Sequence, residues 1–290
     1  MELAVLSDIH SNYVALERCM EYAFGRGISR FVFLGDYIGE FAYPERTMEQ
    51  LLQYREKYDC VFIRGNKEDY WAGYRKGGEQ GWPEYSSVTG ALYYAYRHLS
   101  KRDLDFLHGL PVTAEIAHEG LPVLTACHGS PVSVRESMRF DDGSAERILD
   151  REEKEYVLCG HTHLQGKTCR SGRTALNPGS AGMSLGAGGM AQFAVLSGTD
   201  GQWKEEFISL DFDRERMVRE MKESGLWDRA PYWCRITERL LLGREGQKEV
   251  GHGKVLQRAM ELCRQDTGAC NWPDIPEKYM ERAAGELLGG

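Results

Sequence analysis

The sequence predicts an α/β protein with a helical C-terminal region, on the basis of three observations. Short apolar runs alternate with helical patterns over residues 1–66, which is typical of a sheet with parallel strands. Further along, apolar runs come in pairs separated by turn residues, which indicates antiparallel hairpins. From Asp213 onward, apolar residues recur at helical spacing.

The first part of the chain fits a βαβαβ order. Three apolar runs predict strands, at Leu3–Leu6, Phe31–Leu34 and Cys60–Ile63. Leu16 and Met20 lie on one helical stripe between the first two runs, and Pro44 suits the first position of a second helix. This alternation predicts parallel strand pairs.

Residues 68–107 break the rhythm and predict a helical insertion rich in aromatic side chains, among them Tyr70, Trp71, Tyr74, Trp82, Tyr85, Tyr93, Tyr94 and Tyr96. Packing is the more common role of such residues. Shaping a substrate pocket is the alternative, because the insertion directly follows Gly65 and Asn66.

The next part predicts short strands, mostly in hairpins. The runs are Val112–His118, Val123–Cys127, Tyr156–Cys159, Lys167–Arg170, Thr174–Leu176, Phe193–Leu196 and Trp203–Leu210. We therefore expect a parallel first half, an antiparallel second half, one domain over residues 1–212, and a helical extension over 213–290 packed on it. Three roles are open for the extension: covering the sheet, forming a dimer face, or closing over a site.

Composition excludes several classes of protein. The formal net charge of −8 lacks the basic footprint of a general nucleic-acid binder, so no strong binding of that kind is expected. No apolar run approaches the roughly 20 residues needed to span a membrane, and the N-terminus is not a signal peptide. The eight cysteines form no CxxC pair, which fits reduced thiols in a cytoplasmic protein. A homo-oligomer is compatible with the sequence.

Five of the apolar runs end in side chains that can bind metal. In chain order these are Asp8 with His10, Asp36, Asn66, His128, and His161 with His163. Residues just past the carboxyl ends of strands converge on one rim of an α/β sheet. Asp8 and His10 are two residues apart, so in an extended chain they face the same side, and the later histidine pair repeats this spacing.

The types of side chain in this group predict which metals could bind. Two carboxylates, one amide oxygen and four imidazoles suit Mn, Fe, Zn or Ni better than Ca or Mg alone. Seven side chains are too many for one tetrahedral site, and they fit two ions that share a bridging carboxylate. Any one of these residues alone is more often structural. The order and spacing of all five groups favour a dinuclear site.

The series D-x-H, G-D, G-N, H-G and G-H-x-H resembles the calcineurin-like metallophosphoesterases, over about residues 1–210. The short N-terminal spacing and Asn177-Pro178-Gly179-Ser180 are most similar to the compact bacterial and archaeal phosphodiesterase branch. The resemblance implies an αββα fold, in which two mixed β-sheets form a sandwich flanked by helices. It assigns Asp8, His10, Asp36 and His163 to one ion. It assigns Asp36, Asn66, His128 and His161 to the other, with Asp36 as the bridge.

The resemblance implies a phosphoesterase that hydrolyses a small phosphodiester or phosphomonoester by attack of a hydroxide held between the two ions. The residues expected to act in catalysis are Asp36, Asn66, Lys67 and His128. Lys67 stands where many relatives have histidine. It keeps a charge, but with an ordinary pKa of about 10.4 it is a poor acid near neutral pH. A non-catalytic metal-binding scaffold and a nuclease are the alternatives.

Two further residues near the motifs are weaker candidates. Arg64 is a second cation beside the site, although a solvated charge is slightly more common for such a residue. Tyr37 follows Asp36 and has ordinary packing as an equally common role. No role is assigned to the remaining histidines, His98, His108, His118 and His252.

Overall fold

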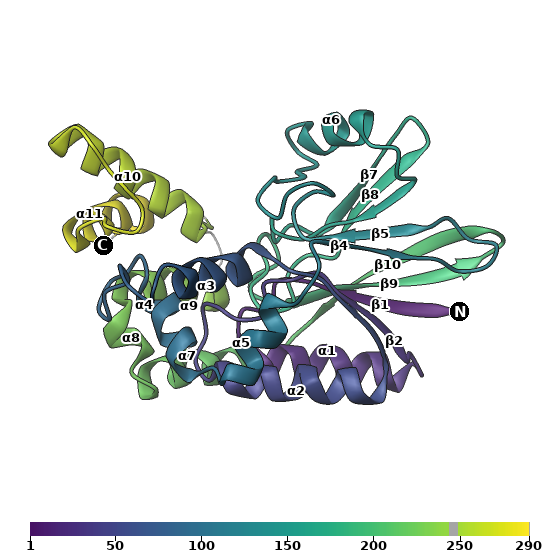
Figure 1. Ribbon diagram of the computed structural model, residues 1–290, viewed down its shortest axis with the longest axis horizontal. Coiled ribbons are helices and arrows are strands. Elements are labelled where there is room, and N and C mark those ends of the chain that lie inside the picture. Colours follow the sequence, from purple (N-terminus) through teal and green to yellow (C-terminus); the bar gives the residue numbers. More distant parts are fainter. Residues whose placement is uncertain (244–248, 290) are drawn as a thin grey trace.

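Over residues 1–243 and 249–289, which the computed structural model describes, the chain forms two five-stranded β-sheets (Figure 1). The first sheet has the order β10-β9-β1-β2-β3. Its strands are β1 (Glu2–Leu6), β2 (Arg30–Phe33), β3 (Asp59–Phe62), β9 (Ala191–Thr199) and β10 (Gln202–Leu210). The second sheet has the order β4-β5-β6-β8-β7. Its strands are β4 (Thr113–Ile116), β5 (Leu124–Cys127), β6 (Tyr156–Leu158), β7 (Gly166–Arg170) and β8 (Arg173–Asn177).

The three N-terminal strands pair in parallel, as the sequence predicts. Val5 lies opposite Val32, and Val32 lies opposite Val61. The expectation of an antiparallel second half is wrong for the centre of the second sheet, because β5, β6 and β8 also pair in parallel. The short helix α6 (Ser144–Arg151), which the sequence analysis did not predict, makes the crossover from β5 to β6.

Helices cover the outer faces of the two sheets, so the αββα arrangement is confirmed. Alternate residues of β1 show the layers. Leu3 and Val5 face the core between the sheets, and Ala4 and Leu6 face the helices of the first sheet. These helices are α1 (Tyr13–Gly25) and α2 (Pro44–Lys57), which Figure 1 shows side by side along the first sheet. Helix α6 packs on the second sheet.

The insertion is helical, as the sequence predicts. It forms α3 (Asn66–Lys76), α4 (Gly90–His98) and α5 (Lys101–His108). Its aromatic side chains mostly pack: Tyr74 stacks on Trp82 with ring centroids 4.1 Å apart, and the indole nitrogen of Trp71 donates to the carbonyl of Leu92 at 3.0 Å. Tyr70 is the member of this set that lines the cavity described below.

The C-terminal region forms α7 (Arg214–Glu223), α8 (Leu226–Arg229), α9 (Pro231–Leu242), α10 (His252–Thr267) and α11 (Glu277–Leu288). These helices share one buried cluster with Tyr13, Val14, Phe41 and Met183 from the sheet-bearing part of the chain. Figure 1 shows α10 and α11 together, at the end of the molecule opposite to the N-terminus. All eight cysteines are free thiols. Among the described residues, no helix has the length and apolar character that crossing a membrane requires.

Candidate metal centre

The five groups of candidate ligands follow strand ends, at one rim of the two sheets. Asp8 and His10 follow β1, and Asp36 follows β2. Asn66 begins α3 after β3. His128 follows β5, and His161 and His163 follow β6. The structure brings all seven side chains into one connected cluster.

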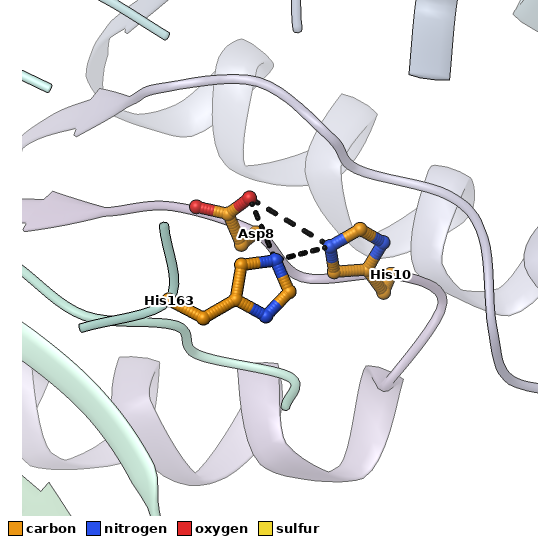
Figure 2. Close-up of side chains that lie close together, drawn as sticks. All are labelled: Asp8, His10 and His163. Carbon is orange, nitrogen blue, oxygen red and sulfur yellow. Dashed lines mark hydrogen bonds and ion pairs between the residues drawn. The ribbon is translucent and has the colours of Figure 1, made fainter. Parts of the chain in front are cut away.

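One group within the cluster contains Asp8, His10 and His163 (Figure 2). The Nε2 atom of His163 lies 3.2 Å from Oδ1 of Asp8 and 3.0 Å from Nε2 of His10. The Nε2 atom of His10 lies 3.7 Å from the same aspartate oxygen. Figure 2 shows the two rings and the carboxylate pointing toward one another, with His163 arriving from a separate loop.

The second group surrounds His128, which is fully buried. Its Nε2 atom lies 3.5 Å from Oδ1 of Asp36 and 3.1 Å from Oδ1 of Asn66. The ring of His161 is next to it, with centroids 5.1 Å apart. These four residues are the set that the resemblance assigns to one ion.

Two carboxylates lie between the groups. Oδ2 of Asp36 is 3.9 Å from Nε2 of His10, while its Oδ1 faces His128, so this carboxylate spans both groups. Asp8 also lies between them, because its Oδ1 is 4.0 Å from Nε2 of His128. The assignment of Asp36 as the bridge stays a prediction.

The orientation of two histidines fits metal binding. Nδ1 of His128 donates to the carbonyl of Leu34, and Nδ1 of His163 donates to the carbonyl of Met183, each at 2.7 Å. A carbonyl can only accept a hydrogen bond, so each Nδ1 carries the proton. In the neutral ring Nε2 is then left with a free lone pair that faces the cluster. Metal-binding histidines are oriented in this way by their other ring nitrogen.

His10 is oriented by a carboxylate instead. Its Nδ1 lies 2.5 Å from Oε2 of Glu40, a buried residue that the sequence analysis did not identify. Burial lowers the pKa of His10, but the Glu40 carboxylate raises it to about 10. Its Nε2 points to Asp8.

One buried oxygen of Asp8 has no hydrogen-bond partner in the described part of the chain. Oδ2 of Asp8 accepts from the hydroxyl of Ser7 at 2.6 Å and from the backbone N–H of His161 at 2.9 Å. Its Oδ1 is buried and has no hydrogen-bond partner among the described residues. Burial opposes ionisation, but His163 and His128 hold the pKa of the Asp8 carboxyl well below its usual range. A buried, charged and unmatched oxygen among imidazole nitrogens fits a divalent cation.

The backbone conformation that brings Asp8 and His10 together differs from the extended one expected from the sequence. The expectation that Asp8 and His10 share a face of an extended chain is wrong, because β1 ends at Leu6 and both residues have φ angles near 55°. His161 and His163 also have positive φ, at 66° and 57°, and contact different groups. Asp36 is the fifth candidate ligand in this left-handed region, with φ of 53°. Such conformations are strained for residues other than glycine.

Glu68 is a supporting residue that the sequence analysis did not identify. It is buried, and its carboxylate accepts from the backbone N–H groups of Asp36 at 3.0 Å, Tyr37 at 3.1 Å and Gly65 at 2.7 Å. It therefore ties together the two loops that carry Asp36 and Asn66. Burial and the nearby Asp36 carboxylate raise the pKa of Glu68 to about 7.

The segment Asn177–Ser180 is a second support. The side-chain amide of Asn177 donates to the carbonyl of Gly160 at 2.7 Å, which holds the loop before His161. The hydroxyl of Ser180 donates to the carbonyl of Asp8, also at 2.7 Å. This turn therefore fixes two loops that carry candidate ligands.

Lys67 lines the cavity beside the candidate ligands, and its ammonium is paired with Glu40. Nζ is 2.5 Å from Oε1 of Glu40 and 5.6 Å from the ring centroid of Trp233. Burial lowers its pKa, but Glu40 and Asp36 outweigh this and raise it above the ordinary value. Lys67 is therefore a fixed cation and a poor proton donor.

The two weaker candidates, Arg64 and Tyr37, make contacts outside the candidate metal site. Arg64 pairs with Asp69, Nε to Oδ1 at 3.2 Å. The hydroxyl of the buried Tyr37 donates to the backbone carbonyls of Phe33 and Ile63 at 3.0 and 2.7 Å, which is a packing role.

His252, which had no assigned role, does line the site. It begins α10, is buried, and its Nε2 contacts the hydroxyl of Thr237 at 2.9 Å. Nothing in the sequence indicated this position, because His252 is not part of a motif. The insertion, the C-terminal helices and the loops that carry candidate ligands line a half-open cavity of about 280 Å³.

Comparisons with known proteins identify the family of this chain. Residues 1–201 match the calcineurin-like phosphoesterase superfamily domain. The uncharacterized protein MJ0912 of Methanocaldococcus jannaschii is 24% identical over 257 residues, which cover 83% of this chain and 98% of that protein.

Solved structures share the fold. A metallophosphoesterase from Sphaerobacter thermophilus aligns with a TM-score of 0.64 and 24% identity, covering 78% of this chain and 94% of that one. The hypothetical protein PH1004 of Pyrococcus horikoshii aligns with a TM-score of 0.70 and 21% identity, covering 81% and 97%.

Proposed function

Because the chain belongs to the calcineurin-like phosphoesterase superfamily, we propose that it is a dinuclear metal-dependent phosphoesterase acting on a small phosphodiester or phosphomonoester. One observation carries the proposal. The Nε2 atoms of His10, His128 and His163 face the Asp8 and Asp36 carboxylates. Nδ1 of His128 and of His163 donates to a backbone carbonyl, and Nδ1 of His10 forms an ion pair with Glu40.

Two divalent ions, of Mn, Fe, Zn or Ni, would be held by the two groups of side chains described above. When bound, they supply Lewis acidity for the phosphoryl oxygens and a water nucleophile near neutral pH. The first group would be Asp8, His10, Asp36 and His163. The second group would be Asp36, Asn66, His128 and His161.

The protein side chains have separate tasks in this proposal. Burial lowers the pKa of His161 to about 4, so its imidazole is neutral and its free ring nitrogen can bind a metal ion. Lys67 adds a positive charge at the wall of the cavity, where it would stabilise negative charge on the phosphoryl group. Glu40 keeps Lys67 and His10 in place.

Two alternatives stay open with less support. A non-catalytic scaffold on this fold would be favoured by the loss of ligands, yet all seven positions carry side chains that can bind metal. A nuclease would need a basic track for the nucleic-acid backbone. The net charge of −8 does not favour one.

The test is hydrolysis of bis-p-nitrophenyl phosphate and p-nitrophenyl phosphate by the full chain loaded with Mn²⁺. The ratio of the two rates separates a diesterase from a monoesterase. Asp200→Asn is a matched control for Asp36→Asn, because Asp200 is an exposed turn residue with a similar φ of 54°. Activity that is equal in these two variants, or absent with all four metals, would contradict the proposal.

A further inference from the structure

His252 brings a buried ring nitrogen to the cavity from a part of the chain that lies outside the family domain. It begins α10, whereas the match to the family domain ends at residue 201. The residue is only 7% exposed, and it lines the cavity together with Trp233 of α9. The two rings are in contact, with centroids 4.4 Å apart. The C-terminal helices therefore add a polar group to the lining of this cavity.

The contacts of His252 fix the position of its ring proton. Nε2 lies 3.2 Å from the backbone carbonyl of Trp233 and 2.9 Å from the hydroxyl of Thr237. The carbonyl can only accept a hydrogen bond, and the Thr237 hydroxyl uses its own proton to donate to the same carbonyl at 3.1 Å. Nε2 therefore carries the proton and donates to this pair. Burial lowers the pKa of His252 to about 3, so the ring is neutral near pH 7 and Nδ1 keeps its lone pair.

Nδ1 is the remaining polar atom of this side chain. The two nitrogens of an imidazole point in widely different directions, so a ring that directs Nε2 at α9 directs Nδ1 away from that helix. Among the described residues, the hydrogen bonds of His252 all involve Nε2. An unprotonated Nδ1 repels phosphate oxygens and accepts from O–H and N–H groups. A ligand that covers it without donating leaves a buried acceptor unpaired, which is unfavourable.

A short row of contacts connects His252 to the candidate ligands. The ring centroid of Trp233, which lies against His252, is 5.6 Å from Nζ of Lys67. The backbone N–H of Lys67 donates to Oδ1 of Asp36 at 2.8 Å. His252 and Asp36 also line the same cavity. An ester whose phosphoryl group is bound at the candidate ligands would therefore have its organic part within reach of Nδ1.

We propose, resting on the proposed function, that His252 is a specificity residue whose Nδ1 accepts a hydrogen bond from a hydroxyl or N–H group on the organic part of the phosphate ester. The substrate is then the ester of a polar alcohol. The C-terminal helices take part in choosing it, because α9 holds the ring and α10 carries it.

Two esters with the same carbon ring test the proposal. Cyclohexyl phosphate has no donor on its ring, whereas myo-inositol monophosphate has a hydroxyl on each remaining ring carbon. The kcat/KM of the inositol ester is divided by that of the cyclohexyl ester, for the Mn²⁺-loaded full chain and for His252→Phe. Phenylalanine keeps a ring and removes both nitrogens. We expect this ratio to fall at least about fivefold in His252→Phe. An unchanged ratio overturns the inference.

Two further variants separate the acceptor from the shape of the side chain. In His252→Asn the side-chain oxygen can take the place of Nδ1, so at least part of the lost ratio should return. His108 is exposed on α5, and His108→Phe is the matched control that should leave the ratio unchanged. No recovery in His252→Asn, or an equal fall in His108→Phe, overturns the inference.

Nitrogen NMR of the wild-type chain gives a readout that does not depend on the folding of any variant. The chain carries isotope-labelled histidine and Zn²⁺, because Mn²⁺ is paramagnetic and broadens nearby signals. It is titrated with the phosphonate analogue of myo-inositol monophosphate, which is not hydrolysed. We expect the Nδ1 signal of His252 to begin in the range of an unprotonated nitrogen and to move upfield as the hydrogen bond forms. A protonated Nδ1, or a signal that does not move at saturation, overturns the inference.

The two proposals fail in different ways. If neither these esters nor the p-nitrophenyl esters are hydrolysed, the proposed function fails, and the NMR titration still measures whether Nδ1 accepts from the ligand. If the esters are hydrolysed and His252→Phe leaves the ratio unchanged, the role of His252 fails and the phosphoesterase stands.

Discussion

The carboxylate of Glu40 lies 2.5 Å from Nδ1 of His10, and both side chains are buried beneath the cavity. This contact fixes the ring so that its other nitrogen faces Asp8. Glu40 is not adjacent to any motif, so its role follows from the structure alone. A carboxylate at this position makes the imidazole a stronger metal donor.

Glu40→Gln should weaken metal binding by about 10- to 100-fold, because the amide orients His10 less well and does not increase its basicity. Calorimetric titration with Mn²⁺ measures the effect. Glu49→Gln is the control, since Glu49 is exposed on α2. An Mn²⁺ affinity equal to that of the wild type would show that Glu40 does not support the site.

Asp36→Asn should reduce turnover to less than about a tenth of the wild-type rate, because the lost charge weakens both groups of ligands at once. The fold should persist, since the buried clusters between and around the sheets are made of other residues. Elemental analysis after Mn²⁺ supply should give two ions per wild-type chain and fewer in the variant. One ion per wild-type chain would refute the dinuclear assignment.

Lys67→Ala should slow the hydrolysis of an alkyl ester and of a p-nitrophenyl ester to the same extent, by about 10²–10³. The reason is that Glu40 and Asp36 outweigh burial and raise the pKa of Lys67, so it acts through its charge. A much larger effect on the alkyl ester would instead identify Lys67 as the leaving-group acid. No effect on either ester would remove it from the catalytic residues.

Gly65→Ala should damage the site and the fold together. A Cβ at this position would lie 2.2 Å from Oδ1 of Asp36 and 2.4 Å from its backbone nitrogen, so the ligand loop has to move. We expect a loss of about 1–3 kcal/mol in the free energy of unfolding, together with weaker Mn²⁺ binding. Gly73→Ala, inside the helix α3 that Gly65 precedes, is the control, because its Cβ meets open space and alanine favours the helix by up to about 1 kcal/mol. Equal behaviour of the two variants would mean that the loop adapts.

His252 should make the protein less stable in mild acid. Burial lowers its pKa to about 3, with Glu40 opposing this effect and Lys67 and His10 adding to it. The unfolded chain, with an ordinary pKa of about 6.5, takes up a proton below that pH and the folded chain does not. Stability is therefore lost as the pH falls below about 6.5, by roughly 2 kcal/mol at pH 5.

His252→Gln should remove that part of the acid sensitivity. Urea unfolding at pH 7 and pH 5 measures it, and His108→Gln, at an exposed position of α5, is the control. If the His252→Gln variant loses as much stability between the two pH values as the wild type does, the histidine is not held neutral.

The sequence predicted the positions of several strands and of the polar residues that follow them. Apolar runs locate β1, β2, β3, β5 and β6, and the polar residues after them form the cluster, because parallel strands end at one rim. The left-handed backbone at Asp8 and His10 was not predictable from their spacing, since any two-residue interval also fits an extended chain.

Residues that act through long-range contacts carried no sequence signal. Glu40 reaches His10 across thirty positions of the chain, and His252 comes to the cavity from α10. Neither has a neighbour in sequence that indicates its role. The parallel centre of the second sheet was missed for a related reason: the crossover helix α6 is only eight residues long and its pattern is too short to stand out.

The left-handed φ angles of Asp8, His10, Asp36, His161 and His163 set thermal stability of the metal-free protein against metal binding. Each such residue costs about 1–3 kcal/mol relative to a relaxed backbone, and glycine relieves most of that cost. A library screened for thermal stability without metal would therefore enrich glycine at these five positions and lose the ligands. Screening with metal present would reverse the preference, since binding then rewards the strained side chains.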